Sequence, residues 1–222
     1  MSTVRDDAVR RLQDAGVIAV IRLADGARLQ AVAEALAAGG VRALEVTMTV
    51  PRAAALIAQL SRSLPQEFIV GAGTVLDAAT AREVIDAGAR FVVSPVFRRA
   101  VLQACHERDV AALPGCFTPT EILDAWDAGA DIVKVFPATA LGPGFFSDLR
   151  GPLPQVRLMP TGGVTRENAG DWIRAGAAAI GVGTALVDRR AVDEGRFETI
   201  TANARHFVDA VQQARGAAAG VR

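Results

Sequence analysis

The stretch LDAWDAGADIVKVFP, residues 123–137, passes from a helix-like segment through a small-Gly-small junction into a run of β-branched and aromatic residues. The same pattern recurs in EALAAGGVRALEVTM (34–48), EVIDAGARFVVSP (83–95) and WIRAGAAAIGVG (172–183). Glycine adopts the left-handed conformation that ends many helices at little cost. We therefore predict helix ends at Gly39, Gly88, Gly129 and Gly176. The strands that follow are almost continuously apolar, which is typical of parallel sheets covered on both faces.

Four further runs have strand character, at residues 17–22, 68–73, 110–115 and 156–163, which gives eight candidate strands. Helical segments fill the gaps, near 27–38, 51–63, 77–87, 97–108, 118–128, 143–150, 166–175 and 196–213. A further helix within residues 1–16 precedes the first strand, and a frayed tail is expected over about 214–222. The sequence thus predicts a single-domain (β/α)8 TIM barrel with an extra N-terminal helix, spanning residues 1–222. A doubly wound open sheet is the alternative, although the first βα turn lacks a G-x-G-x-x-G pattern.

The composition argues against several classes of partner. The chain has 24 basic and 24 acidic residues, so no global field attracts nucleic acid or an anionic membrane. No apolar run has transmembrane length, and the N-terminus lacks the apolar core of a signal peptide. Cys105 and Cys116 show no C-x-x-C spacing, which favours reduced thiols in a cytoplasmic protein. No acidic or histidine cluster has metal-ligand spacing, so we expect no metal and no other cofactor.

Lys134 is the only lysine among the 24 basic residues. It interrupts an apolar strand, where a charged group is costly unless it is paired or its pKa shifts. A desolvated lysine amine loses its proton readily and can condense with a ketone to form a Schiff base, which an arginine guanidinium cannot do. Glu45, on another strand, is the candidate acid–base group for such a reaction. The structural alternative is that Lys134 only forms a buried ion pair with Glu45.

Chemistry in barrels gathers where the strands end and the βα loops begin. Arg22 lies at such an end, and Thr47 shares the strand face of Glu45 because side chains alternate with a period of two. The glycine-rich segments TGGVTRENA (161–169) and GVGTALV (181–187) follow the last two strands, where barrels often bind phosphate on backbone N–H groups. The alternative is that these segments are two tight turns.

Together these residues resemble the class I 2-keto-3-deoxy-6-phosphogluconate (KDPG) aldolases, a family that includes enzymes also cleaving 4-hydroxy-2-oxoglutarate. The resemblance rests on AGGVRALEVT, VGAGTV, Ser94-Pro95, LPGCFTPTE, KVFPA, PTGGV and GVGTALV, which occur in order over roughly residues 17–190. It implies a barrel, usually a homotrimer, that cleaves the phosphorylated keto acid to pyruvate and glyceraldehyde 3-phosphate without metal. Cleavage of 4-hydroxy-2-oxoglutarate would give pyruvate and glyoxylate.

The resemblance also implies roles for individual residues. The Schiff-base lysine falls on Lys134 and the acid–base glutamate on Glu45. The keto-acid pocket falls on Thr74 and Thr161, with Phe136 beside it. The phosphate site falls on Gly162, Gly163, Gly183 and Thr184, where many members have serine.

One position departs from the family pattern. Many members carry an arginine at the position of Thr49, where it binds the substrate carboxylate, but this chain reads EVTMTVP there. We predict that Arg22 binds the carboxylate instead, with Thr47 among the substrate-binding residues. The alternative is that Arg22 only neutralises Glu45.

Other functions stay open. A phosphosugar isomerase or epimerase would need paired acid–base residues or metal ligands at the strand ends, and the sequence shows neither. An aldolase for the galactonate-derived epimer and a non-catalytic phosphosugar-binding barrel are further alternatives.

Overall fold

The strands of the computed structural model, which describes residues 3–24 and 26–219, pair in parallel throughout. One sheet has the order β5-β4-β3-β2-β1-β9, and a second has the order β6-β7-β8. The strands are β1 (Val17–Ile21), β2 (Ala43–Thr47), β3 (Ile69–Gly73), β4 (Phe91–Val93), β5 (Ala111–Leu113), β6 (Gly115–Cys116), β7 (Val133–Val135), β8 (Leu158–Pro160) and β9 (Ile180–Val182).

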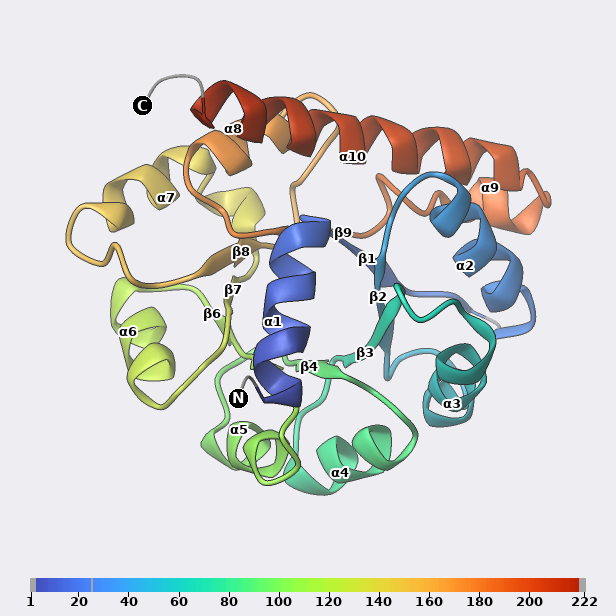
Figure 1. Cartoon of the computed structure of the whole chain (residues 1–222), viewed down its shortest axis with the longest axis horizontal. Coiled ribbons are helices and arrows are strands. Elements are labelled where there is room, and N and C mark those ends of the chain that lie inside the picture. The colour runs from blue at the N-terminus through green and yellow to red at the C-terminus, as the bar shows by residue number, and fades with distance from the viewer. Residues whose placement is uncertain (1–2, 25, 220–222) are drawn as a thin grey trace.

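Helices surround the strands (Figure 1). They are α1 (Val4–Ala15), α2 (Leu29–Ala38), α3 (Ala53–Ser63), α4 (Ala78–Asp86), α5 (Arg99–His106), α6 (Pro119–Asp127), α7 (Pro143–Arg150), α8 (Ala169–Arg174), α9 (Arg189–Asp193) and α10 (Phe197–Ala219), with 3-10 turns at η1 (Gly26–Arg28) and η2 (Ala138–Ala140). Within the described ranges, no helix combines the length and the apolar character needed to cross a membrane.

The two sheets continue one another around a common axis. The first strand pairs with both β2 and the last strand, β9. A bridge between Thr161 and Gly181 links the end of β8 to β9, and only Pro114 separates β5 from β6. The predicted α/β class is therefore confirmed, with parallel strands curled about an axis inside a shell of helices (Figure 1).

Several details differ from the sequence predictions. The short helix α9 was not predicted; it begins where the Asp188 carboxylate accepts a hydrogen bond from the Ala191 N–H. Helix α10 continues to Ala219 instead of fraying from residue 214, while residues 220–222 lie outside the described part. At the first junction Gly40, with φ 91°, is the left-handed residue, whereas Gly39 is not.

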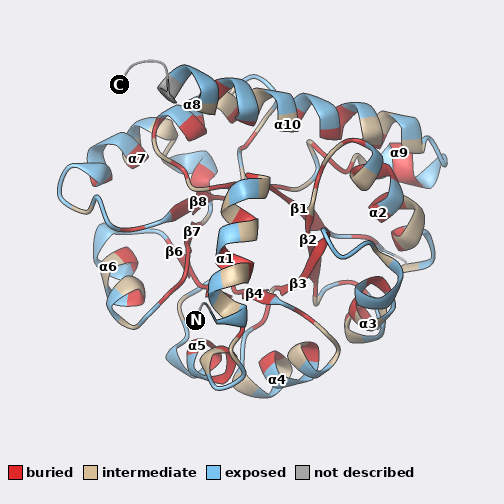
Figure 2. Ribbon diagram, viewed as in Figure 1, coloured by how far each residue is buried: buried red, intermediate tan, exposed pale blue. Residues whose placement is uncertain are grey.

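The buried apolar residues form two clusters. Figure 2 shows buried residues along the strands and exposed residues on the outer sides of the helices. The larger cluster packs the outward faces of the strands against the surrounding helices. A smaller cluster combines α1 with alternate strand residues and comprises Ala8, Val9, Leu12, Ile18, Ala43, Ile69, Phe91, Val93, Ala111, Leu113, Ile132, Met159 and Ala179. Because α1 lies across one end of the ring of strands in Figure 1, this second cluster fills the interior at that end.

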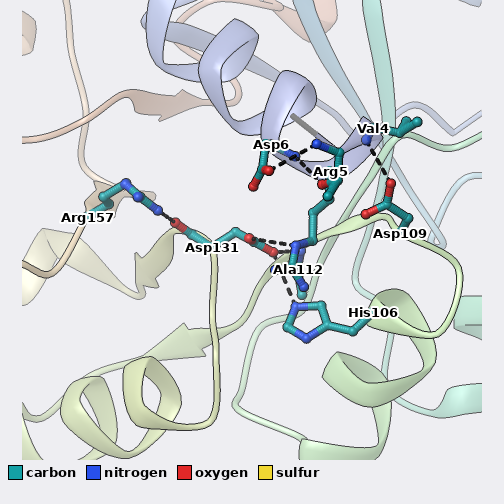
Figure 3. A network of polar contacts seen from close by, with 9 residues as sticks. Val4, Arg5, Asp6, His106, Asp109, Ala112, Asp131 and Arg157 are labelled. Atoms are coloured by element: carbon teal, nitrogen blue, oxygen red, sulfur yellow. Dashed lines mark hydrogen bonds and ion pairs between the residues drawn. The ribbon is translucent and has the colours of Figure 1, made fainter. Parts of the chain in front are cut away.

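Polar contacts fasten α1 at the amino ends of the strands (Figure 3). The Asp109 carboxylate accepts a 2.7 Å hydrogen bond from the Val4 N–H at the first turn of α1. Arg5 Nε lies 3.4 Å from Asp131 Oδ1, while Asp131 Oδ2 accepts a 2.9 Å bond from the Ala112 N–H and lies 3.4 Å from His106 Nε2. His106 therefore lies at the amino ends of the strands, remote from their carboxyl ends.

Candidate active site

Strand alternation directs Lys134 and Glu45 into the interior of the ring. Ala43 and Ile132 belong to the interior cluster beside α1. Ala43 lies two positions before Glu45 on β2, and Ile132, directly before β7, lies two positions before Lys134, so the side chains of each pair point to the same side. Glu45 is 1% exposed and Lys134 is 2% exposed. The charged layer thus lies directly above an apolar layer, toward the carboxyl ends of the strands.

Two glycines leave the space that the interior polar groups occupy. A Cβ on Gly73 would lie 1.8 Å from Glu45 Oε1, and a Cβ on Gly181 would lie 2.4 Å from Thr161 Oγ1. Any larger residue at either place would displace the carboxylate or the hydroxyl. Glu45 Oε2 and Thr161 Oγ1 are both buried without a hydrogen-bond partner among the described residues. Buried polar atoms rarely stay unpaired, so these two atoms indicate a position that a polar ligand can fill.

Burial shifts the pKa values of both charged groups toward their neutral forms. Desolvation lowers the pKa of the Lys134 amine, the Glu45 carboxylate opposes this shift, and Arg22 adds to it. Desolvation also raises the pKa of the Glu45 carboxyl, against the opposing effects of Lys134 and Arg22. Lys134 Nζ lies 4.8 Å from the centre of the Phe136 ring. This environment favours a reactive amine next to a carboxyl group that can exchange protons.

A cavity of about 110 Å³ lies beyond the layer of Glu45 and Lys134, at the carboxyl ends of the strands. It brings together seven residues predicted for the substrate site, namely Arg22, Phe136, Thr161, Gly162, Gly163, Gly183 and Thr184. Gly162 and Gly163 take left-handed φ values of 84° and 76°. A larger cavity, about 580 Å³, lies at the amino ends of β3, β4 and β5, away from these residues.

The remaining predicted residues lie around this cavity without lining it. Lys134 and Glu45 are buried in the layer described above. The Thr47 hydroxyl donates a 2.9 Å hydrogen bond to the Ile21 carbonyl and lies 2.7 Å from the Thr49 hydroxyl, so it already has protein partners. Thr74 directly follows Gly73 and has a left-handed φ of 61°, which is strained for a β-branched residue.

The contacts of Thr47 also place position 49 beside the end of β1. Thr49 reaches the Ile21 carbonyl through the Thr47 hydroxyl, and Arg22 is the next residue along the chain. An arginine at position 49 and one at position 22 would therefore start from neighbouring points on the rim. Sequence reasoning did not single out Gly73 and Gly181 as space-making residues, although both lie in glycine-rich motifs at strand ends.

Other reactive groups offer no competing site. Burial raises the pKa of each of the two thiols, Cys105 and Cys116, to about 12. Over residues 3–24 and 26–219, no group of three or more His, Cys, Asp or Glu side chains is arranged to hold a metal ion.

Comparisons with known proteins agree with this site. A family model described as "KDPG and KHG aldolase" matches residues 9–203. The "KHG/KDPG aldolase" of Escherichia coli strain K12 is 38% identical over 178 residues, covering 80% of this chain and 83% of that protein.

Solved structures agree as well. A KDPG aldolase from Legionella pneumophila, "with pyruvate captured at low pH as a covalent carbinolamine intermediate", superposes with a TM-score of 0.83 at 30% identity over 89% of this chain and 96% of that chain. A designed cube-shaped cage made "by fusing symmetric oligomeric domains" has a TM-score of 0.85 at 28% identity over 92% of this chain and 75% of the cage chain. With the family model covering most of its length, the chain belongs to the KDPG and KHG aldolase family.

Proposed function

We propose that this protein is a class I aldolase that cleaves KDPG to pyruvate and glyceraldehyde 3-phosphate through a Schiff base on Lys134. The observation that carries the proposal is the single lysine of the chain, 2% exposed, beside a buried glutamate whose Oε2 atom has no hydrogen-bond partner in the described part of the chain. Burial lowers the pKa of the Lys134 amine and raises the pKa of the Glu45 carboxyl. These shifts suit a nucleophilic amine and an acid–base carboxyl group.

The reaction follows from the positions of these groups. The neutral Lys134 amine attacks the C2 ketone of the substrate, and the resulting carbinolamine takes a proton from the Glu45 carboxyl and loses water to give a protonated imine. Glu45 takes the proton of the C4 hydroxyl as the C3–C4 bond breaks, and the electron pair of that bond moves into the imine to form an enamine. Glyceraldehyde 3-phosphate leaves, and the Glu45 carboxyl gives its proton to C3. Hydrolysis of the protonated imine then releases pyruvate and restores the neutral amine and the protonated Glu45 carboxyl. The lysine supplies the electron sink, so the proposed reaction needs no metal and no cofactor.

The residues that line the cavity support a proposed position for each end of the substrate. Backbone N–H groups of Gly162, Gly163 and Gly183, with the Thr184 hydroxyl, form the proposed phosphate site. Thr161 and Phe136 line the proposed keto-acid pocket, with Thr74 proposed as a further substrate-binding residue outside the cavity lining and Thr47 supporting the rim. Arg22 lines the same cavity, which supports its proposed role in binding the carboxylate.

The finer architecture is also a proposal. Counting β5 and β6 as one strand interrupted at Pro114 gives eight strand positions that close through the β9–β1 pairing and the Thr161–Gly181 bridge. We propose a closed (β/α)8 barrel that forms a single domain over residues 1–222, with α1 as an additional N-terminal helix. The free, buried thiols Cys105 and Cys116 support a cytoplasmic location.

We also propose a homotrimer. Leu76, Val96 and Phe117 are large apolar residues that are 51%, 48% and 37% exposed, and they follow β3, β4 and β6. Their positions beyond the carboxyl ends of neighbouring strands give one apolar surface that a second copy can cover. Light scattering should give three times the 23.1 kDa chain mass, and Leu76→Arg should lower it. A monomeric wild-type protein would contradict the trimer.

The reaction is tested by measuring pyruvate release from KDPG, from its galactonate-derived epimer and from 4-hydroxy-2-oxoglutarate. We expect pyruvate from KDPG, with slower release from the unphosphorylated substrate. A preference for the galactonate-derived epimer would support the alternative aldolase. Absence of pyruvate release from all three would contradict the proposed activity and favour a non-catalytic phosphosugar-binding barrel.

A further inference from the structure

Helix α10 contacts both glycine-rich loops of the cavity through one buried residue. Asn203 is 3% exposed, and its Nδ2 donates a 3.1 Å hydrogen bond to the Leu186 carbonyl in the loop after β9. Its Oδ1 accepts a hydrogen bond from Arg166 Nη2 in the loop after β8. One side chain therefore connects two loops that lie 20 residues apart along the chain.

The contacts continue from Asn203 to the glycines that line the cavity. In the loop after β9, the Leu186 N–H donates a 3.0 Å bond to the Gly183 carbonyl. In the loop after β8, Asn168 Nδ2 donates a 2.8 Å bond to the Gly163 carbonyl and Asn168 Oδ1 accepts a 2.8 Å bond from the Thr165 N–H, the residue before Arg166. Polar contacts thus run behind the cavity from Gly163 to Gly183.

A second residue of α10 supports the same loop. His206 Nε2 lies 3.2 Å from the Arg166 carbonyl oxygen, which accepts its hydrogen bond. Arg166 is thereby held at both its side chain and its backbone, and the loop after β8 has two contacts with α10.

The burial of Asn203 requires an explanation, because its neighbours on α10 are apolar. Ile200, Ala204 and Phe207 are fully buried on this helix. An amide among them is costly unless both its donor and its acceptor are satisfied. Asn203 is satisfied only when the loops after β8 and β9 are both in place, so it selects one relative position of the two loops.

We propose that Asn203 is a positioning residue for the phosphate site, which fixes the two loops so that their backbone N–H groups converge on a phosphate dianion. The inference rests on the proposed aldolase function. A dianion held by N–H groups from two loops depends on their spacing, whereas the carboxylate and ketone ends of the substrate contact other residues. Asn203 therefore sets the preference for phosphorylated over unphosphorylated substrate without touching either.

The test compares wild type with Asn203→Leu, which has similar size and loses both hydrogen bonds. KM and kcat are measured for KDPG and for 4-hydroxy-2-oxoglutarate, together with the inhibition constant of inorganic phosphate against the unphosphorylated substrate. We expect about a tenfold increase in KM for KDPG and in the phosphate inhibition constant, which is the scale of one or two hydrogen bonds. Both constants for 4-hydroxy-2-oxoglutarate should change less than about twofold, since its binding uses no phosphate contact.

Thr201→Val is the matched control on the same helix. The Thr201 hydroxyl donates a 3.0 Å bond to the Ala35 carbonyl of α2 rather than to either loop, so its loss should loosen α10 without changing the KM ratio of the two substrates. If Asn203→Leu does not fold, Arg166→Gln takes its place in the test. This substitution removes the hydrogen bond from Arg166 to Asn203 at an exposed position. Asn203→Gln, which keeps the amide, should recover part of the loss.

The outcomes separate the two proposals. A folded Asn203→Leu protein with an unchanged KM ratio and unchanged phosphate inhibition overturns the positioning role. An equal change of the ratio in Thr201→Val also overturns it, because general loosening of α10 would then explain both. If wild type neither cleaves KDPG nor responds to phosphate, the proposed function fails.

Discussion

Asp131 and Glu45 are two buried carboxylates, one before the amino end of β7 and the other within β2 facing the opposite mouth of the ring. Asp131 has a backbone N–H, an arginine and a histidine within 3.4 Å. Among the residues that the structure describes, Glu45 has no ion-pair partner, and its Oε2 atom has no hydrogen-bond partner. Both burials cost free energy. Direct contacts compensate the burial of Asp131, whereas Glu45 has only the electrostatic effects of Lys134 and Arg22.

The difference indicates what each end is for. The contacts of Asp131 with the Ala112 N–H, Arg5 and His106 fasten α1 over the strands and stabilise the fold (Figure 3). At the Glu45 end, burial lowers the pKa of the Lys134 amine and raises the pKa of the Glu45 carboxyl, and Glu45 Oε2 has no hydrogen-bond partner among the described residues. Such perturbed and incompletely paired groups are typical of sites whose polar groups are completed by substrate. Changes at the Glu45 end should therefore affect turnover, and changes at the Asp131 end should affect stability.

The largest effect on turnover is expected for Lys134→Arg. Arginine keeps the positive charge but cannot form an imine, and no other lysine can take over. Steady-state pyruvate release should fall more than about a hundredfold, equivalent to roughly 3 kcal/mol of barrier. A folded variant, checked by circular dichroism, that retains more activity than this would remove Lys134 from the mechanism.

Glu45→Gln should have the next largest effect. Loss of a positioned acid–base group should lower kcat by roughly 10²–10⁴-fold. Slow formation of a pyruvate adduct on Lys134 should remain, which separates the two roles. Normal turnover of this variant would reduce Glu45 to a structural neighbour of the lysine.

Arg22→Ala should act on binding more than on chemistry. Removing a charged hydrogen bond of about 1.5–3 kcal/mol should increase KM for KDPG by about 10–100-fold. Because Thr49 lies beside the end of β1, adding Thr49→Arg should restore part of the affinity. The proposal that Arg22 replaces an arginine at position 49 would be wrong if Arg22→Ala bound pyruvate with wild-type affinity. It would also be wrong if Thr49→Arg restored no affinity in a folded double variant.

Asp131→Ala should change stability and leave turnover nearly unaffected. It leaves the buried Ala112 N–H unpaired, which should lower the free energy of unfolding by about 1–3 kcal/mol in urea titrations. Asp171→Ala is the control, since it removes an exposed pair with Arg174 that should contribute about 0–1 kcal/mol. If Asp131→Ala lost activity at full stability, the division between the two ends of the ring would be wrong.

Much of the fold and of the candidate site was predictable from sequence. The repeated helix–Gly–strand patterns specify parallel strands, and they place Lys134, Glu45 and the glycine-rich loops toward the carboxyl ends of these strands. The predicted strand over 156–163 is only Leu158–Pro160 in the structure, since its glycines turn away in left-handed conformations. The packing around the Glu45 carboxylate was not predictable from local sequence, because Gly73 on a different strand leaves the space that the carboxylate occupies. The contacts of Asn203 join α10 to the loops after β8 and β9, which are far apart in the sequence. No local sequence pattern predicts such contacts.

The most direct test of the Schiff-base mechanism is trapping with pyruvate and borohydride, followed by peptide mass mapping across a range of pH. We predict one reduced pyruvate adduct, on the peptide containing Lys134 and absent from Lys134→Arg. Since the neutral amine reacts and burial lowers its pKa, the trapping rate should rise with pH to a midpoint below the ordinary lysine value of 10.5. Absence of an adduct, or an equal adduct on Lys134→Arg, would contradict the central claim.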